Sequence, residues 1–70
     1  MPHVDIKMLP GRPAELKEEL ARKARELVAA TLAVDPGIIS VSVQDVHLED
    51  WDKAMQTITP ETIIIRNGSQ

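Results

Sequence analysis

The sequence predicts a small α/β protein of β-α-β type, with a short C-terminal helix or strand, that assembles into oligomers. Three segments carry this prediction: an alternating stretch at residues 2–8, a helical stretch at residues 14–33 and a second alternating stretch at residues 38–46. Two strands separated by a long helix form a parallel pair. The 70 residues suffice for one domain, residues 1–70, and leave no room for a second.

The first strand is predicted by alternation of apolar and polar residues. Its apolar face consists of Pro2, Val4, Ile6 and Met8. This period of two is typical of a strand that buries one face. Pro10 and Gly11 then predict a turn, and Pro13 is suited to the first turn of the helix that follows.

The helix is predicted over residues 14–33 by a stripe of apolar side chains with a helical period. The stripe consists of Leu16, Leu20, Ala24, Leu27, Val28, Thr31 and Leu32. Such a stripe indicates the face that packs on the sheet. Pro36 disfavours α geometry at Asp35, so the helix is expected to stop at the sequence Asp35-Pro36-Gly37.

The second strand is predicted because Ile39, Val41 and Val43 alternate with polar residues. Residues 47–55, which contain Trp51, are expected to form a short helix, and residues 58–61 a loop. The β-branched residues 62–65 predict a third strand, and residues 66–70 form a polar tail.

Composition excludes several classes of function. The net charge of −3 and the single aromatic residue argue against a nucleic-acid partner. Cysteine is absent and there are two histidines, so neither disulfides nor a dedicated zinc site is expected. No segment resembles a signal peptide or a membrane span, so a cytoplasmic protein without a membrane partner is expected.

Oligomerisation is expected because a chain of this length is hard to stabilise alone. A domain of about 60 residues buries only about 60% of the surface that its unfolded chain exposes. Two strands also leave open edges, and one helix covers one face of their sheet. Pairing with a second copy would bury this surface, in a symmetric dimer or a ring built from dimers.

The start of the chain, Met1-Pro2, is the unusual chemical feature. The initiator Met is normally removed before a small residue, which would expose the secondary amine of Pro2. An α-amino group titrates near about 7.7–8.0, and desolvation or a nearby cation lowers its pKa toward the value that suits a general base. Many proteins begin with Met-Pro for no catalytic reason, so the feature alone leaves both readings open.

The order of motifs resembles the 4-oxalocrotonate tautomerase family. Those motifs are MPHVDIK at residues 1–7, LPGR at residues 9–12, the long helix, ISVSV at residues 39–43 and the acidic-Trp segment at residues 49–51. The resemblance implies a β-α-β fold in dimers or hexamers. It also implies a proton transfer on an enol or unsaturated keto acid, without metal or organic cofactor.

The resemblance also assigns roles to individual residues. Pro2 matches the catalytic base, and Arg12 matches an arginine that binds a substrate carboxylate, which a neighbouring subunit can supply. Trp51 falls near the aromatic wall of the pocket. Ser42 stands where better-studied relatives carry a second arginine, so it brings a hydrogen-bond donor without a charge, and an arylpyruvate enol is as plausible a substrate as a dicarboxylate.

Other readings remain open from the residues alone. Arg12 would otherwise be a solvated turn residue, and Trp51 could belong to the core. Arg66 and Lys53 could supply the missing second cation, although both are more typical of surface charges. His3 points to the face opposite Pro2, which favours a structural or interface role, and His47 is expected at the surface.

Two other functions are compatible with the same scaffold. A hydrating dehalogenase would need a carboxylate to activate water, for which Asp45 or Glu49 is available. The other alternative is a non-catalytic oligomeric binding protein that has kept only the fold.

Overall fold

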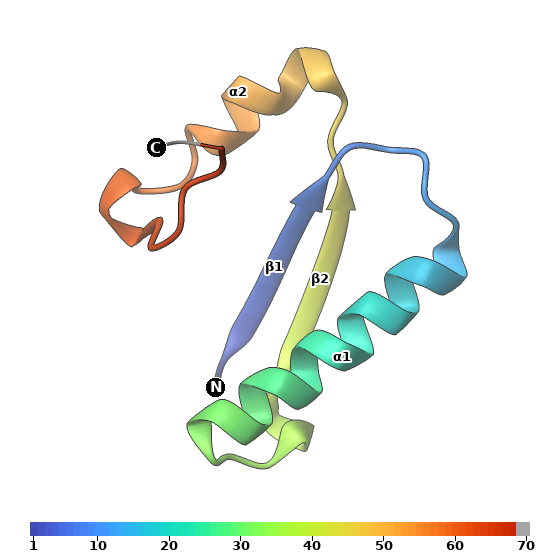
Figure 1. Cartoon of the computed structure of the whole chain (residues 1–70), viewed down its shortest axis with the longest axis vertical. Helices are drawn as coiled ribbons and strands as arrows, with labels where there is room; N and C mark the ends of the chain where they lie inside the picture. The colour runs from blue at the N-terminus through green and yellow to red at the C-terminus, as the bar shows by residue number, and fades with distance from the viewer. Residues whose placement is uncertain (69–70) are drawn as a thin grey trace.

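A computed structural model of the chain describes residues 1–68. Strand β1 (His3–Met8), helix α1 (Ala14–Leu32), strand β2 (Ser40–Asp45) and helix α2 (Trp51–Met55) follow one another along the chain. Short 3-10 turns lie at Pro36–Ile38, Leu48–Asp50 and Pro60–Thr62. Helix α1 lies along one face of the two-stranded sheet, and α2 lies beyond the ends of the strands (Figure 1). The β-α-β fold is therefore confirmed.

The two strands are parallel over their whole length. His3 lies opposite Ser40 and Met8 opposite Asp45. In this register the apolar residues of both strands share the face toward α1, and the polar residues share the other face, apart from Asp45, which pairs with Lys17 of α1. The alternation read from the sequence thus predicted both faces correctly, although β2 is shorter than expected, because Ile38 belongs to a 3-10 turn.

Helix α1 begins where Pro13 predicted and ends one residue before the expected end. It ends because Ala33 adopts the left-handed conformation, with φ 57° and ψ 49°, and donates its N–H to the carbonyl of Ala29. Asp35 is therefore not the stop signal. Its side chain instead accepts a hydrogen bond of 2.8 Å from the N–H of Gly37 and caps the next turn.

The conformation of Ala33 gives a stability prediction. A left-handed residue with a Cβ costs about 1–2 kcal/mol, and glycine avoids this cost. Ala33→Gly should therefore raise the free energy of unfolding by about 1 kcal/mol in urea denaturation at fixed protein concentration. Ala30→Gly, inside the same helix, is the matched control and should lower it by about 1 kcal/mol. A loss of stability in both variants would contradict this reading of the helix end.

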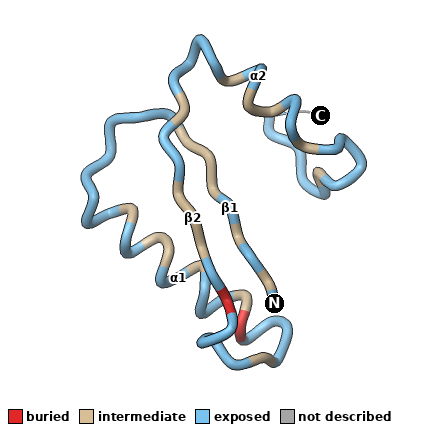
Figure 2. The backbone as a smooth tube through the Cα atoms, turned by 180° about the vertical axis from the view of Figure 1, so that it is seen from behind, coloured by how far each residue is buried: buried red, intermediate tan, exposed pale blue. Residues whose placement is uncertain are grey.

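The core of one chain is small. Among the described residues only Ala29 and Ile39 are buried, and both lie at the same end of the strands (Figure 2). Leu20, Ala24 and Val28 are half-buried, as their place in the apolar stripe predicts. The prediction was wrong for the rest of the stripe, which is exposed: Leu16, Leu27, Thr31 and Leu32. A helix about 10 Å wide overhangs two strands only about 4.8 Å apart.

The third strand is a wrong prediction, whereas the short helix near Trp51 is confirmed as α2. Residues 62–65 include the end of a 3-10 turn and an extended Ile63, and the described part of the chain contains no strand there. β-branched residues favour strands only where a neighbouring backbone is available, and this segment lies near α2 instead. Ser69 and Gln70, at the end of the predicted polar tail, lie outside the described residues.

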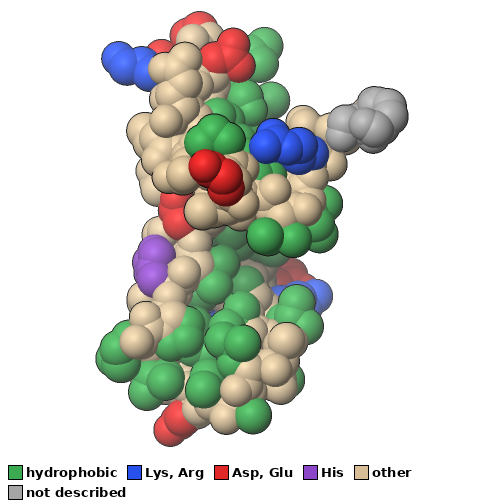
Figure 3. All heavy atoms as spheres, turned by 90° about the vertical axis from the view of Figure 1, so that its left-hand side faces the viewer, with side chains coloured by type: hydrophobic (Ala, Val, Ile, Leu, Met, Phe, Trp, Pro, Cys, Tyr) green, Lys and Arg blue, Asp and Glu red, His purple; other side chains and the backbone are tan. Residues whose placement is uncertain are grey.

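Large apolar side chains remain on the surface. Figure 3 shows hydrophobic side chains gathered over the half of the molecule that lies away from α2. Over both halves of the described chain, the exposed large apolar residues are Met1, Leu9, Leu16, Leu27, Leu32, Ile38, Leu48, Ile64 and Ile65. None of the helices in residues 1–68 has the length and apolar character needed to cross a membrane.

Candidate active site

Pro2 lies directly before β1 and is held by the neighbouring strand. Its carbonyl oxygen accepts a hydrogen bond of 3.3 Å from the N–H of Ser40, and its side chain is half-buried. Met1 is 95% exposed. Removal of Met1 would therefore cost little packing, while the backbone of Pro2 would stay anchored to β2.

Arg12 lies in the connection between β1 and α1, at the other end of β1. The connection turns at Gly11, whose φ of 124° favours glycine. The exposed Arg12 side chain donates a hydrogen bond of 3.3 Å from Nη1 to the carbonyl of Leu9. The six residues of β1 span roughly 20 Å, so one chain does not bring Pro2 and Arg12 together. Figure 1 shows the start of the chain and the connection between β1 and α1 at opposite ends of β1.

Ser42 belongs to a polar network on the sheet face away from α1. Asp5 is the centre of this network: its Oδ1 accepts hydrogen bonds from Ser42 Oγ at 2.5 Å and from Gln44 Nε2 at 2.7 Å, and its other oxygen pairs with Lys7. His3 Nδ1 lies 2.6 Å from Ser40 Oγ, and its Nε2 lies 3.0 Å from Ser42 Oγ.

Sequence reasoning missed this network, although its signal was present. Polar residues occupy every second position of both strands, and once the strands are paired in register their side chains meet. The prediction for Ser42 took that residue alone, whereas in the structure it bonds to His3 and Asp5 of β1.

Hydrogen bonds hold the pKa of Asp5 well below its usual value. The ammonium of Lys7 makes the largest contribution, followed by the hydroxyl of Ser42 and the amide of Gln44. Each of these donors favours the ionised carboxylate. Asp5 is therefore an anion, and an acceptor only, throughout the range in which the protein would act.

This low pKa gives a pH-dependent stability prediction. Because the folded pKa lies below the unfolded value of about 3.9, the contribution of Asp5 is present above that pH and is lost as the pH falls below it. The stability advantage of the wild type over Asp5→Asn should therefore be constant near neutral pH and shrink on acidification below about pH 4. Denaturation curves of both proteins across the acid range measure it, and an advantage that does not shrink would contradict this role of Asp5.

Trp51 begins α2 and lies over the end of the sheet that is distant from Pro2. Together with Asp5, Lys7, Met55 and Ile58 it lines a hollow of about 390 Å³. Its indole is half-buried, so Trp51 combines a packing role with a place in a pocket wall. Within one chain this wall therefore lies near the C-terminal end of β1, where the connection that contains Arg12 begins.

Of the remaining candidates, Arg66 lines a second hollow, of about 340 Å³, together with Trp51 and Met55. Arg66 is exposed and donates from Nη2 to the carbonyl of Pro60 at 3.3 Å, and Lys53 is exposed at the end of α2. Asp45 pairs with Lys17 at 2.7 Å, which reduces its availability to activate water. Glu49 and His47 are exposed, as expected for His47. Residues 1–68 contain no group of three His, Asp or Glu placed to hold a metal ion.

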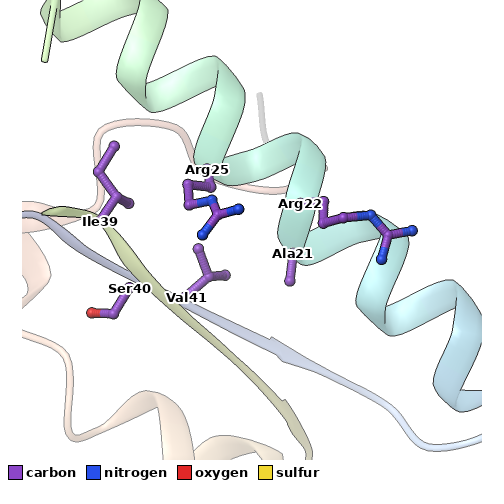
Figure 4. A pocket seen from close by; sticks show the side chains of 6 residues that line it. All are labelled: Ala21, Arg22, Arg25, Ile39, Ser40 and Val41. Carbon is purple, nitrogen blue, oxygen red and sulfur yellow. The ribbon is translucent and has the colours of Figure 1, made fainter. Parts of the chain in front are cut away.

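A further hollow, of about 250 Å³, lies between α1 and the outer edge of β2. Arg25 extends from the helix toward Ile39 and Val41, whereas the Ser40 side chain points away from the helix (Figure 4). Arg22 also lines this hollow. It contains none of the residues that the sequence assigned to the active site.

The fold and these residues define a small β-α-β protein with a strand-anchored proline at its amino-terminal end and an arginine in its first turn. Residues 2–53 match the family model described as "Tautomerase enzyme". The chain is also 39% identical over 51 residues to a "Probable tautomerase" of Xylella fastidiosa (strain 9a5c). That match covers 73% of this chain and 62% of the relative. The chain belongs to the tautomerase family.

Proposed function

We propose that this protein is a keto-enol tautomerase that acts on an unsaturated or aryl 2-keto acid through the amine of Pro2. The observation that carries the proposal is the position of Pro2: the family match begins at this residue, and the N–H of Ser40 anchors its carbonyl at the start of β1. Once Met1 is removed, this position presents a secondary amine with a fixed direction at the end of the sheet.

The proposed reaction is a proton transfer with no net change in composition. The neutral amine of Pro2 takes the proton from the enol hydroxyl, the carbonyl forms, and the electron pair of the C=C bond moves to the carbon. The Pro2 ammonium then gives its proton to that carbon, so the same nitrogen acts first as base and then as acid.

Arg12 is proposed to hold the substrate carboxylate and to stabilise the charge that develops in the dienolate. Because roughly 20 Å of strand separates it from Pro2, we propose that the two residues of one site come from different subunits. The open edges of the two-stranded sheet and the exposed Leu16 and Leu27 support such assembly. Trp51, at the same end as the Arg12 turn, would supply the apolar wall.

Mixing two impaired variants tests the shared site. Pro2→Ala and Arg12→Ala chains, denatured and refolded together, should regain about a quarter of the wild-type activity, because in random hybrids about one site in four receives both intact residues from different chains. Sedimentation of the wild type at micromolar concentration should show a dimer or a larger species. A mixture no more active than its two components, or a folded monomer, would contradict the shared site.

A further inference from the structure

The hydrogen bonds on the polar face of the sheet have a defined direction. An ionised carboxylate only accepts hydrogen bonds, so Ser42 donates its one hydroxyl proton to Asp5. The oxygen of Ser42 then accepts from Nε2 of His3, which lies 3.0 Å away. The chain of bonds therefore requires a proton on Nε2 of His3.

The second nitrogen of the imidazole connects His3 to Ser40, with 2.6 Å between Nδ1 and Oγ. In the neutral imidazole Nδ1 is an acceptor, and Ser40 donates its hydroxyl proton to it. In the imidazolium Nδ1 is a donor, and the hydroxyl proton of Ser40 becomes free for another acceptor. Protonation of His3 thus creates a cation and a hydroxyl donor side by side.

This pair lies at the Pro2 end of the sheet. His3 follows Pro2 directly, with about 3.8 Å between consecutive Cα atoms, and the backbone N–H of Ser40 bonds to the carbonyl of Pro2. The His3 side chain lies on the face opposite the one expected for the Pro2 ring, but the proposed base is the backbone nitrogen of Pro2, which belongs to neither face. Both side chains are exposed, so a ligand at this end can reach them. Arg12 of the same chain lies at the far end of β1.

The charged groups that face His3 come from its own strand. Asp5 reaches it through Ser42, and Lys7 is paired with Asp5, so their charges offset each other. The neighbouring strand β2 presents Ser40, Ser42 and Gln44, which do not titrate. Once Met1 is removed, the proposed Pro2 amine is a further titratable group at this end of the chain.

We propose that His3, together with Ser40, contacts the anionic group of the substrate at Pro2 alongside the Arg12 that a neighbouring subunit supplies, and thereby adds to the specificity for acids. Ser42 and Asp5 are positioning residues that act through His3, because their hydrogen bonds orient its ring. The inference rests on the proposed function only in taking the substrate at Pro2 to be an anion. Protonated His3 would place a cation next to Ser42, whose own side chain is uncharged.

Binding of an unreactive acid tests this role without turnover. The probe is 3-phenylpropanoate, an aryl acid that cannot enolise, and the protein is the full chain without Met1. Calorimetry should show its Kd rising about fivefold as His3 loses its proton, the size typical of a partly exposed charge pair. NMR of the imidazole in the same protein gives the pH at which this occurs. The uncharged 3-phenylpropanamide should show no such change.

Variants separate His3 from the Pro2 amine, which also titrates. His3→Gln should lose the step in Kd that coincides with the imidazole titration, and it should keep any step due to Pro2. If His3→Gln does not fold, His3→Asn takes its place. His47→Gln removes the other histidine, at the far end of β2, and should bind as the wild type does. Ser42→Ala should change the populations of the two imidazole tautomers seen by ¹⁵N NMR.

Two outcomes would overturn the inference: an unchanged pH profile of Kd in the His3 variants, or a step in Kd that does not coincide with the imidazole titration. These outcomes are distinct from failure of the proposed function. Full turnover in Pro2→Ala would exclude Pro2 as the base, whatever the binding results for His3.

Discussion

Pro2→Ala is expected to lower kcat for keto-enol conversion of phenylpyruvate by about 10²- to 10⁴-fold, the range typical of general acid–base catalysis. Alanine still permits removal of Met1 and leaves a primary α-amine. That amine lacks the ring that fixes the direction of the nitrogen lone pair. Turnover of the enol, followed by ultraviolet absorbance, measures the effect.

Pro60→Ala is the matched control, because it replaces a proline in the C-terminal turn, far along the chain from the proposed base. It should leave kcat unchanged. Pro2→Ala must keep the oligomeric state and the circular dichroism spectrum of the wild type for the comparison to be valid. A folded Pro2→Ala enzyme with wild-type turnover would remove Pro2 from the mechanism.

Arg12→Ala is expected to lower kcat/KM for an anionic enol acid by about ten- to 160-fold. This range corresponds to the roughly 1.5–3 kcal/mol of a charge-assisted hydrogen bond, at about 1.36 kcal/mol per decade. Enolisation of a neutral ketone should be affected less, because it offers no carboxylate. Arg12→Lys should recover part of the loss, since an ammonium cannot match both oxygens of a carboxylate as a guanidinium does.

Arg22→Ala supplies the matched control for Arg12, because Arg22 lies on the exposed middle of α1. It should leave the ratio of acid to ketone turnover unchanged. An equal decline of both substrates in a folded, oligomeric Arg12→Ala protein would show that Arg12 is not the carboxylate clamp. Arg66 and Lys53 would then be the next residues to replace.

Periodicity predicted β1, α1 and β2 because each of them buries one face against another element of the same chain. The failed third strand shows where this reasoning ends. Residues 62–65 have the composition of a strand, but the sequence does not say whether a backbone partner is within reach. The stripe of α1 failed in part for a related reason: the width of the sheet beneath it, not the helical period, decides whether Leu16 and Leu27 are covered.

For the candidate site too, the sequence predicted some features and not others. The order of motifs identified Pro2 and Arg12 as candidates, and the six-residue strand β1 that lies between them keeps the two residues apart within one chain. The bonds between His3 and Ser42 depend on a register that joins residues 39 positions apart. Sequence patterns show that each strand has a polar face, and the register of the pair then decides which polar side chains meet.

Titration of the Pro2 nitrogen tests the proposed role of Pro2 most directly. The chain is produced with ¹⁵N-labelled proline, its mass establishes whether Met1 is present, and the ¹⁵N shift of Pro2 is followed against pH. The expected result is a free amine whose titration coincides with the acidic limb of the pH profile, where kcat/KM rises with pH as the base loses its proton. An active enzyme that retains Met1, and in which the Pro2 nitrogen is therefore a non-titrating amide, would contradict it.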